Sequence, residues 1–182
     1  RPTKVVYVID YSDEGDVIIG RKNLQFLSDL KGKKIGIDGF NSFSHLFILA
    51  ALKQAGVKPS EVILVDSPAQ ELLIALESGK IDAGHTWEPV KSAALEIGYK
   101  QLAKAGDYPG LITDVLAFSV DAIEKRPGDI QAVVKSMLET RDFLDTNEKE
   151  AIQIMAKAEN MSEEEMRRGI AGVHLLNNKD NQ

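Results

Sequence analysis

The strongest constraint on the fold is a regular alternation of strand-like and helix-like segments between residues 33 and 105. The runs Lys34–Ile37 and Glu61–Val65 are short and apolar, and the segment Phe43–Ala55 between them repeats apolar residues with helical spacing. The same order continues with a helix over 69–78, a strand over 81–84, a helix to about 97 and a strand over 99–103. Strands that alternate with helices over short links predict a largely parallel sheet covered on both faces.

Segments of a different character lie on both sides of this block. Strands are predicted at 5–9, 16–20 and 113–120, and helices from Pro127 to about 144, over 148–158 and over 162–172. A block inserted into another by two crossing segments predicts an α/β fold of two lobes with a hinge. The predicted division gives residues 1–28 and 109–182 to lobe one and residues 29–108 to lobe two.

Charge and composition exclude several classes of protein. The 182 residues carry a formal net charge of −6, and an acidic surface disfavours nucleic acid as a partner. The chain has no Cys, so it has no disulfide or thiolate chemistry. No apolar stretch reaches about 18 residues, so we expect contact with a membrane only through a partner or a missing anchor.

Motifs of enzymes and metal sites are absent from the sequence. It contains no G-x-S-x-G, no phosphate-binding G-K-[ST] loop and no G-x-G-x-x-G. His85 and Glu88 lie three residues apart, but two candidate ligands do not make a zinc site. We therefore expect no catalytic activity, no cofactor and no metal.

Five stretches of the chain resemble one family in the family's own order. The chain is similar to the substrate-binding proteins of ABC importers for nitrate, sulfonates, taurine and thiamine-precursor pyrimidines. The matching stretches are KVVYVIDYSDEGDVIIG, LSDLKGKKIGIDGFNSFSHLFILAALKQAGVKPSEV, ALESGKIDAGHTWEP, GLITDVLAFSVDAIEKRPGDIQAVVKSML and KEAIQIMAKAENMSEEEM.

This resemblance implies a type 2 periplasmic-binding-protein fold, in which lobe two is complete and lobe one is partial. It implies an extracytoplasmic protein, periplasmic or anchored outside the cell, that captures a small anion or zwitterion and hands it to an ABC permease. The same fold also resembles the ligand-sensing domains fused to histidine kinases and cyclases, and that alternative stays open. A pyrimidine-synthase-like enzyme ranks third, because the glycine- and cysteine-rich iron segment of those enzymes is missing.

The loop after the strand 34–37 is the first part of the expected site. Ligands of open parallel sheets bind beyond the carboxyl ends of the strands, and a helix N terminus offers unpaired N–H groups to an anion. Hydroxyl groups add donors, and a protonated histidine would add charge. The alternative is that Asn41 or Ser42 only caps the helix. The candidate residues are Gly39, Asn41, Ser42, Phe43, Ser44 and His45.

Two further groups of candidates depend on the resemblance. It places Trp87 and Glu88 at the cleft, where an indole can cover a ligand and a carboxylate can accept from an amine, although Trp87 in a core and Glu88 as a helix cap are equally good interpretations. Lobe one contributes Asp10, Tyr11 and Ser12 at a strand end and Asp114 on the returning strand. The alternative for Asp114 is that it braces the hinge by hydrogen bonding to the backbone. The helix N terminus favours nitrate, sulfonate or carboxylate, the carboxylates favour an amine, and a zwitterion would satisfy both.

Overall fold

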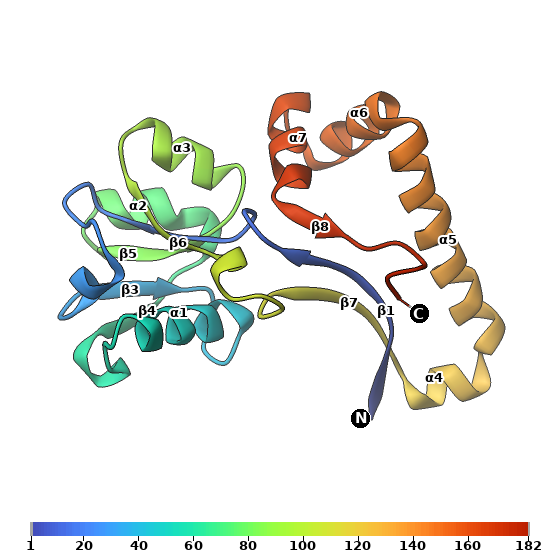
Figure 1. The fold of residues 1–182 in the computed structure, drawn as a ribbon, viewed down its shortest axis with the longest axis horizontal. Coiled ribbons are helices and arrows are strands. Elements are labelled where there is room, and N and C mark those ends of the chain that lie inside the picture. Colours follow the sequence, from blue (N-terminus) through green and yellow to red (C-terminus); the bar gives the residue numbers. More distant parts are fainter. Residues whose placement is uncertain (1, 182) are drawn as a thin grey trace. The chain divides into compact units, whose positions relative to one another are not determined.

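The computed structural model describes residues 2–181 as an α/β protein whose chain forms two compact units (Figure 1). Unit 2 comprises residues 12–112 and 169–173, and unit 1 comprises, of the described residues, 2–11, 113–168 and 174–181. The α/β class predicted from the sequence is confirmed. Each unit is described below by itself.

A five-stranded sheet forms the centre of unit 2, with the strand order β4-β3-β5-β2-β6. Pairing is parallel between β3 and both β4 and β5, whereas β2 is antiparallel to β5 and β6. Four strands therefore run in one direction and β2 runs against them. The strands are β2 (Val17–Gly20), β3 (Lys34–Ile37), β4 (Ile63–Asp66), β5 (Ala83–Thr86) and β6 (Lys100–Lys104).

Helices cover both faces of this sheet. They are α1 (Phe43–Gln54), α2 (Leu72–Glu77) and α3 (Val90–Glu96), joined with 3-10 turns η1 (Leu27–Leu30), η2 (Pro59–Glu61), η3 (Ala69–Glu71) and η4 (Ala105–Asp107). Side chains alternate between the faces of a strand, so Ile18 packs with the α1 core while Val17 and Ile19 pack with the α2 and α3 core. All three are fully buried, which explains why β2 is an uninterrupted apolar run.

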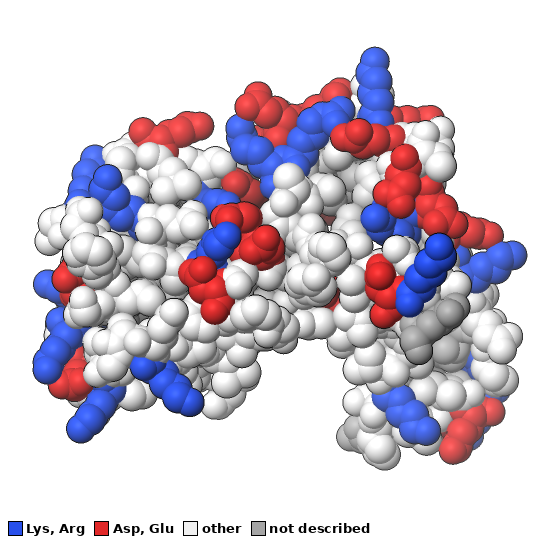
Figure 2. Space-filling model, in the orientation of Figure 1, with Lys and Arg blue, Asp and Glu red and all other residues white. Residues whose placement is uncertain are grey.

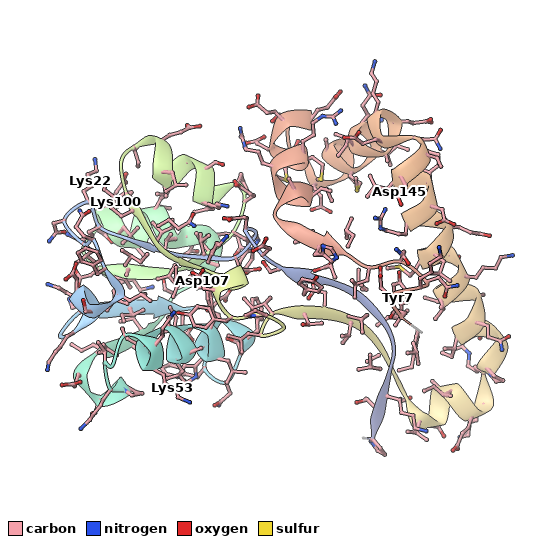
Figure 3. All side chains as sticks on the ribbon, in the orientation of Figure 1. Tyr7, Lys22, Lys53, Lys100, Asp107 and Asp145 are labelled. Atoms are coloured by element: carbon pink, nitrogen blue, oxygen red, sulfur yellow. The ribbon has the colours of Figure 1, made fainter. Side chains whose placement is uncertain are left out.

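Unit 1 combines a three-stranded sheet with helices. The sheet has the order β7-β1-β8, with β1 (Thr3–Ser12), β7 (Thr113–Ser119) and β8 (Val173–Leu175), and β1 is antiparallel to β7. The helices are α4 (Val120–Lys125), α5 (Pro127–Thr146), α6 (Glu148–Glu159) and α7 (Glu163–Ala171). Tyr7, drawn on β1 in Figure 3, is buried, and its hydroxyl donates to the Leu176 carbonyl at 2.8 Å. Burial raises the pKa of Tyr7 above its ordinary value.

The boundaries of the two compact units differ from the predicted boundaries of the two lobes. Strand β2 pairs with β5 and β6, so residues 17–20 belong to unit 2 and not to the same unit as residues 1–11. A third segment, residues 169–173, also joins unit 2, because the N–H groups of Asp13, Glu14 and Gly15 all donate to the Gly172 carbonyl. Such pairings join residues far apart in the sequence, which a local pattern does not encode.

Two smaller elements also differ from the prediction. The helix predicted over 69–78 is a 3-10 turn followed by a short helix, η3 and α2, and the chain turns at Gly79, whose φ is 76°. Strand β8 lies where the sequence predicted no strand, and it is held to β1 partly by the N–H of Leu176, which donates to Ile9. Within residues 2–181, no helix is both long and apolar enough to cross a membrane.

Candidate functional site

The candidate site lies at one edge of the unit 2 sheet. Because β3, β4 and β5 are parallel, their carboxyl ends meet there, and α1 begins at the same edge. The residues that follow these strands are polar or aromatic: Asp38, Ser67 and Trp87. Lys53 lies in the last turn of α1, at the far end of the helix, where a cation suits the negative end of the dipole (Figure 3).

The loop between β3 and α1 depends on two residues with positive φ. Gly39 has φ 83° and Asn41 has φ 64°, and glycine and asparagine are the residue types that adopt this conformation at least strain. The turn they make brings Ser42 to the N-cap of α1. There its hydroxyl accepts from the His45 N–H at 3.2 Å and donates to the Gly39 carbonyl at 2.7 Å. The capping alternative therefore describes what Ser42 does in this structure.

Side chains from the neighbouring strand ends brace the same loop. Ser44 is fully buried, and its hydroxyl accepts from the Asp38 N–H at 2.9 Å. The Asp66 carboxylate accepts from the Gly39 N–H at 3.3 Å. The Asp38 carboxylate in turn accepts from the Ala69 N–H at 3.4 Å. These contacts hold the first turn of α1 in a fixed position relative to the sheet.

The first turn of α1 provides donors for an anion. The N–H groups of Phe43 and Ser44 have no acceptor within the helix, since the first residues of any helix lack one. His45 lies in the same turn, and its Nδ1 accepts from the Asn41 N–H at 3.1 Å. The positive end of the α1 dipole adds to these backbone donors.

Aromatic rings lie beside these donors. The Phe43 ring is 6.3 Å from Trp87 and 5.5 Å from His85, and Trp87 is 5.3 Å from His85, all between centroids. Phe43 is 44% exposed and Trp87 is half-buried, so both present apolar surface to solvent. The Trp87 indole is therefore partly buried: it is neither enclosed in the core nor fully exposed to solvent. Glu88 caps α3, since its carboxylate accepts from the Ser92 N–H at 3.3 Å and from the Ser92 hydroxyl at 3.0 Å.

A buried histidine–carboxylate pair lies under the aromatic rings, and sequence reasoning did not find it. His85 is 2% exposed, and its Nε2 lies 2.7 Å from the Asp16 carboxylate. The other ring nitrogen, Nδ1, is buried and has no hydrogen-bond partner among residues 2–181. The two residues are far apart in the sequence, and only the pairing of β2 with β5 brings them together. A histidine in a short strand of small residues was the available signal.

The loop before β2 is held by ionic contacts. Lys104 donates to the Glu14 carboxylate, and this contact lowers the pKa of Glu14 below its ordinary value. Ser12 is also buried, and its hydroxyl accepts from the Asp16 N–H at 2.9 Å. Ser12 therefore orders the turn that presents Asp16 to His85.

The remaining predicted residues lie in unit 1. Asp10 and Asp114 are direct partners across the β1–β7 ladder, so their carboxylates share one face of the sheet. The Tyr11 ring stacks on His174 with centroids 4.7 Å apart. The structure thus brings Asp10 and Asp114 together within unit 1. It gathers the residues of the α1 loop with Trp87 and Glu88 within unit 2.

Metal-binding geometry was sought in the part of the chain that the structure describes. No group of three His, Asp or Glu side chains there is arranged to hold a metal ion. Acidic and basic side chains are interspersed on the surfaces in view (Figure 2).

Two serine substitutions test whether these hydroxyls stabilise the fold. We expect Ser42→Ala to lower the free energy of unfolding by about 1 kcal/mol, because it removes the N-cap of α1. Ser44→Ala is expected to lower it by about 1–3 kcal/mol, since it leaves the Asp38 N–H without its acceptor. Urea unfolding measures both values. Wild-type stability in both variants would show that these hydroxyls do not contribute to stability.

Comparison with known proteins places this geometry in a family. A family model described as "NMT1/THI5 like" matches residues 3–151. The chain is 29% identical over 143 residues to the taurine-binding periplasmic protein of Escherichia coli K12, a match that covers 77% of this chain and 44% of that protein. The chain thus spans less than half the length of this relative.

Solved structures share the fold. The periplasmic aliphatic sulphonate binding protein SsuA of Escherichia coli superposes with a TM-score of 0.79 at 22% identity, covering 98% of this chain and 63% of that one. The desulfurization enzyme DSZB superposes with a TM-score of 0.68 at 17% identity, covering 92% and 63%. The periplasmic-binding-protein fold implied by the sequence is confirmed, and the chain belongs to the NMT1/THI5-like family.

Proposed function

We propose that this chain is the ligand-binding part of an extracytoplasmic solute-binding protein that captures a small anion or zwitterion for an ABC importer. The observation that carries the proposal is the first turn of α1, whose Phe43 and Ser44 N–H groups lie at the carboxyl edge of a parallel sheet. The braced loop keeps these donors in place without a ligand, which lowers the entropy that binding must remove.

The same site favours a ligand that combines an anionic head with a short apolar part. The N–H groups and the helix dipole suit a sulfonate or a similar oxyanion, and the half-exposed rings of Phe43 and Trp87 suit methylene groups. A taurine-binding relative and a sulphonate-binding structure agree with this choice of ligand class. The Asp10 and Asp114 carboxylates would suit an ammonium group, and their part in binding stays a prediction.

We further propose that the protein acts outside the cytoplasm and delivers its ligand to a permease without chemical change. The periplasmic relatives support this place of action. The fold that it shares with DSZB carries no argument for catalysis, since unrelated chemistries share folds and identity is low. A sensor module fused to a signalling domain would use the same binding chemistry, and a permease gene beside this one would favour transport.

A thermal-shift screen tests the proposed ligand class. The panel contains taurine, ethanesulfonate, nitrate, bicarbonate and an aminopyrimidine, with ethanolamine as the control that matches taurine but lacks the sulfonate. A ligand at about a hundred times its Kd stabilises a protein by about 2.7 kcal/mol, which raises the melting temperature of a chain of this size by roughly 5–10 °C. We expect taurine or ethanesulfonate to give this shift and ethanolamine to give none. A cooperative melt that no anion moves would count against the proposal.

A further inference from the structure

We propose that His85 binds the ligand's anionic group through Nδ1 and takes up a proton from solvent when the anion binds. This inference rests on the proposed function and adds to it the uptake of a proton on binding. The observation behind it is the buried Nδ1 that has no hydrogen-bond partner among the described residues, next to the first turn of α1.

The His85 ring lies against that turn. His85 follows Ala83 by two residues on β5, so its side chain lies on the sheet face that packs against α1. The ring makes edge contacts with Phe43 and Phe47, at 5.5 and 5.6 Å between centroids, and these residues lie in the first two turns of α1. Asp16 occupies the opposite nitrogen, so Nδ1 is the ring atom that points away from the carboxylate.

The charged group in contact with His85 is Asp16. The other side chains placed beside the ring are apolar: Ile18, its cross-strand neighbour on β2, Phe43 and Phe47 from α1, and Trp87 after β5. Two other titratable rings have partners of their own. The Tyr108 ring contacts Phe47, and burial raises the pKa of Tyr108. The His45 ring packs against Phe40, and its Nδ1 accepts from Asn41.

These surroundings leave one nitrogen of His85 without a hydrogen-bond partner among the described residues. A neutral ring that donates through Nε2 to Asp16 leaves Nδ1 as a buried acceptor without a donor, beside the turn whose Phe43 and Ser44 N–H groups lack acceptors. An anion at this position satisfies the backbone donors but repels the lone pair of Nδ1. Protonation of Nδ1 converts it into a donor, and the Asp16 carboxylate stabilises the imidazolium that results. Anion binding and proton uptake therefore favour each other.

The sign of the pH dependence follows from this coupling. The form with a protonated His85 binds the anion more tightly, so affinity is highest at low pH and falls as the proton is lost. We expect the affinity for ethanesulfonate to fall by about tenfold between about pH 5.5 and about pH 8.5. A ligand that donated to Nδ1, such as an amine, would give the opposite sign.

Calorimetry in buffers of different ionisation enthalpy tests the inference at neutral pH, with ethanesulfonate and nitrate as probes. Wild-type protein is expected to take up a fraction of one proton per probe bound. His85→Asn keeps a hydrogen-bonding group near the position of Nδ1 but does not titrate, so its uptake is expected to be close to zero and its affinity independent of pH. His174→Asn, at the exposed position of β8, is the matched control and should keep the wild-type uptake.

A second measurement does not depend on a variant that folds. Nitrogen-15 NMR of the histidine rings distinguishes a bare from a protonated Nδ1, and saturation with ethanesulfonate should convert His85 to the doubly protonated form. Binding without proton uptake, or with an unchanged His85 signal, overturns the inference and leaves the proposed function standing. If wild-type protein binds neither ethanesulfonate nor nitrate, both the inference and the proposed function are overturned.

Discussion

Replacement of Phe47 by alanine is expected to lower the free energy of unfolding by about 3–5 kcal/mol, the usual range for truncating a buried phenylalanine. Phe47 is fully buried in the core between α1 and the sheet, and its ring makes edge contacts with His85 and Tyr108 at 5.6 and 5.5 Å. Truncation leaves a cavity that these rings cannot fill without leaving their present partners.

Urea unfolding measures this effect, with Trp87 as the probe. Trp87 is the single tryptophan of the sequence and lies in unit 2, close to His85, so its fluorescence reports on this core. The control is Phe40→Ala, which removes the same side chain from a position that is 54% exposed. We expect the control to change the stability by less than about 1 kcal/mol. Equal losses in both variants would show that Phe47 is not a central core residue.

The substitution Asn41→Asp is expected to weaken anion binding by roughly 5- to 100-fold while the protein stays folded. Asn41 is exposed at φ 64°, a conformation that aspartate also adopts readily. Two unit charges about 5 Å apart near a protein surface interact by about 1–3 kcal/mol, which accounts for this range of affinity. The new carboxylate would also suit the N terminus of α1, so the fold should gain slightly in stability.

The chain offers a matched control for this change in Asn160. It also has a positive φ, 54°, and lies at the C-cap of α6 in unit 1. Asn160→Asp changes the net charge by the same amount, and we expect it to leave the affinity for ethanesulfonate unchanged. Calorimetric titrations of both variants separate a local effect from a general one. An unchanged affinity in Asn41→Asp would remove the first turn of α1 from the binding site.

The order of elements could be predicted from the sequence where local patterns determine structure. Residues 34–37 and 43–54 form the predicted strand and helix because apolar spacing and the Ser42 cap act within one segment. The direction and place of β2 could not be predicted, since a four-residue apolar run pairs equally well in either direction. Strand β8 is only three residues long, and its pairing with β1 determines its structure.

The candidate site was predictable in part for similar reasons. The loop 39–45 could be located because Gly39, Asn41 and Ser42 are the residue types that such a turn requires. His45 accepts a hydrogen bond from the backbone of Asn41, and the sequence does not record that geometry. The pair of Asp16 and His85 depends on the register between β2 and β5, in which Ile18 lies opposite His85. A prediction of that register would have revealed it.

The contact between Gly15 and Gly172 has a consequence for how the chain is made. A Cβ on Gly172 would lie 2.8 Å from the Gly15 backbone, so the two glycines touch without side chains between them, and three N–H groups of residues 13–15 converge on one carbonyl. Residues 15 and 172 lie far apart in the sequence. The strands of the unit 2 sheet leave the ribosome well before residue 172, so the sheet can begin to form during synthesis, whereas this contact must wait until residue 172 has been added. The turn that presents Asp16 is therefore fastened only after the strands of the sheet have been made.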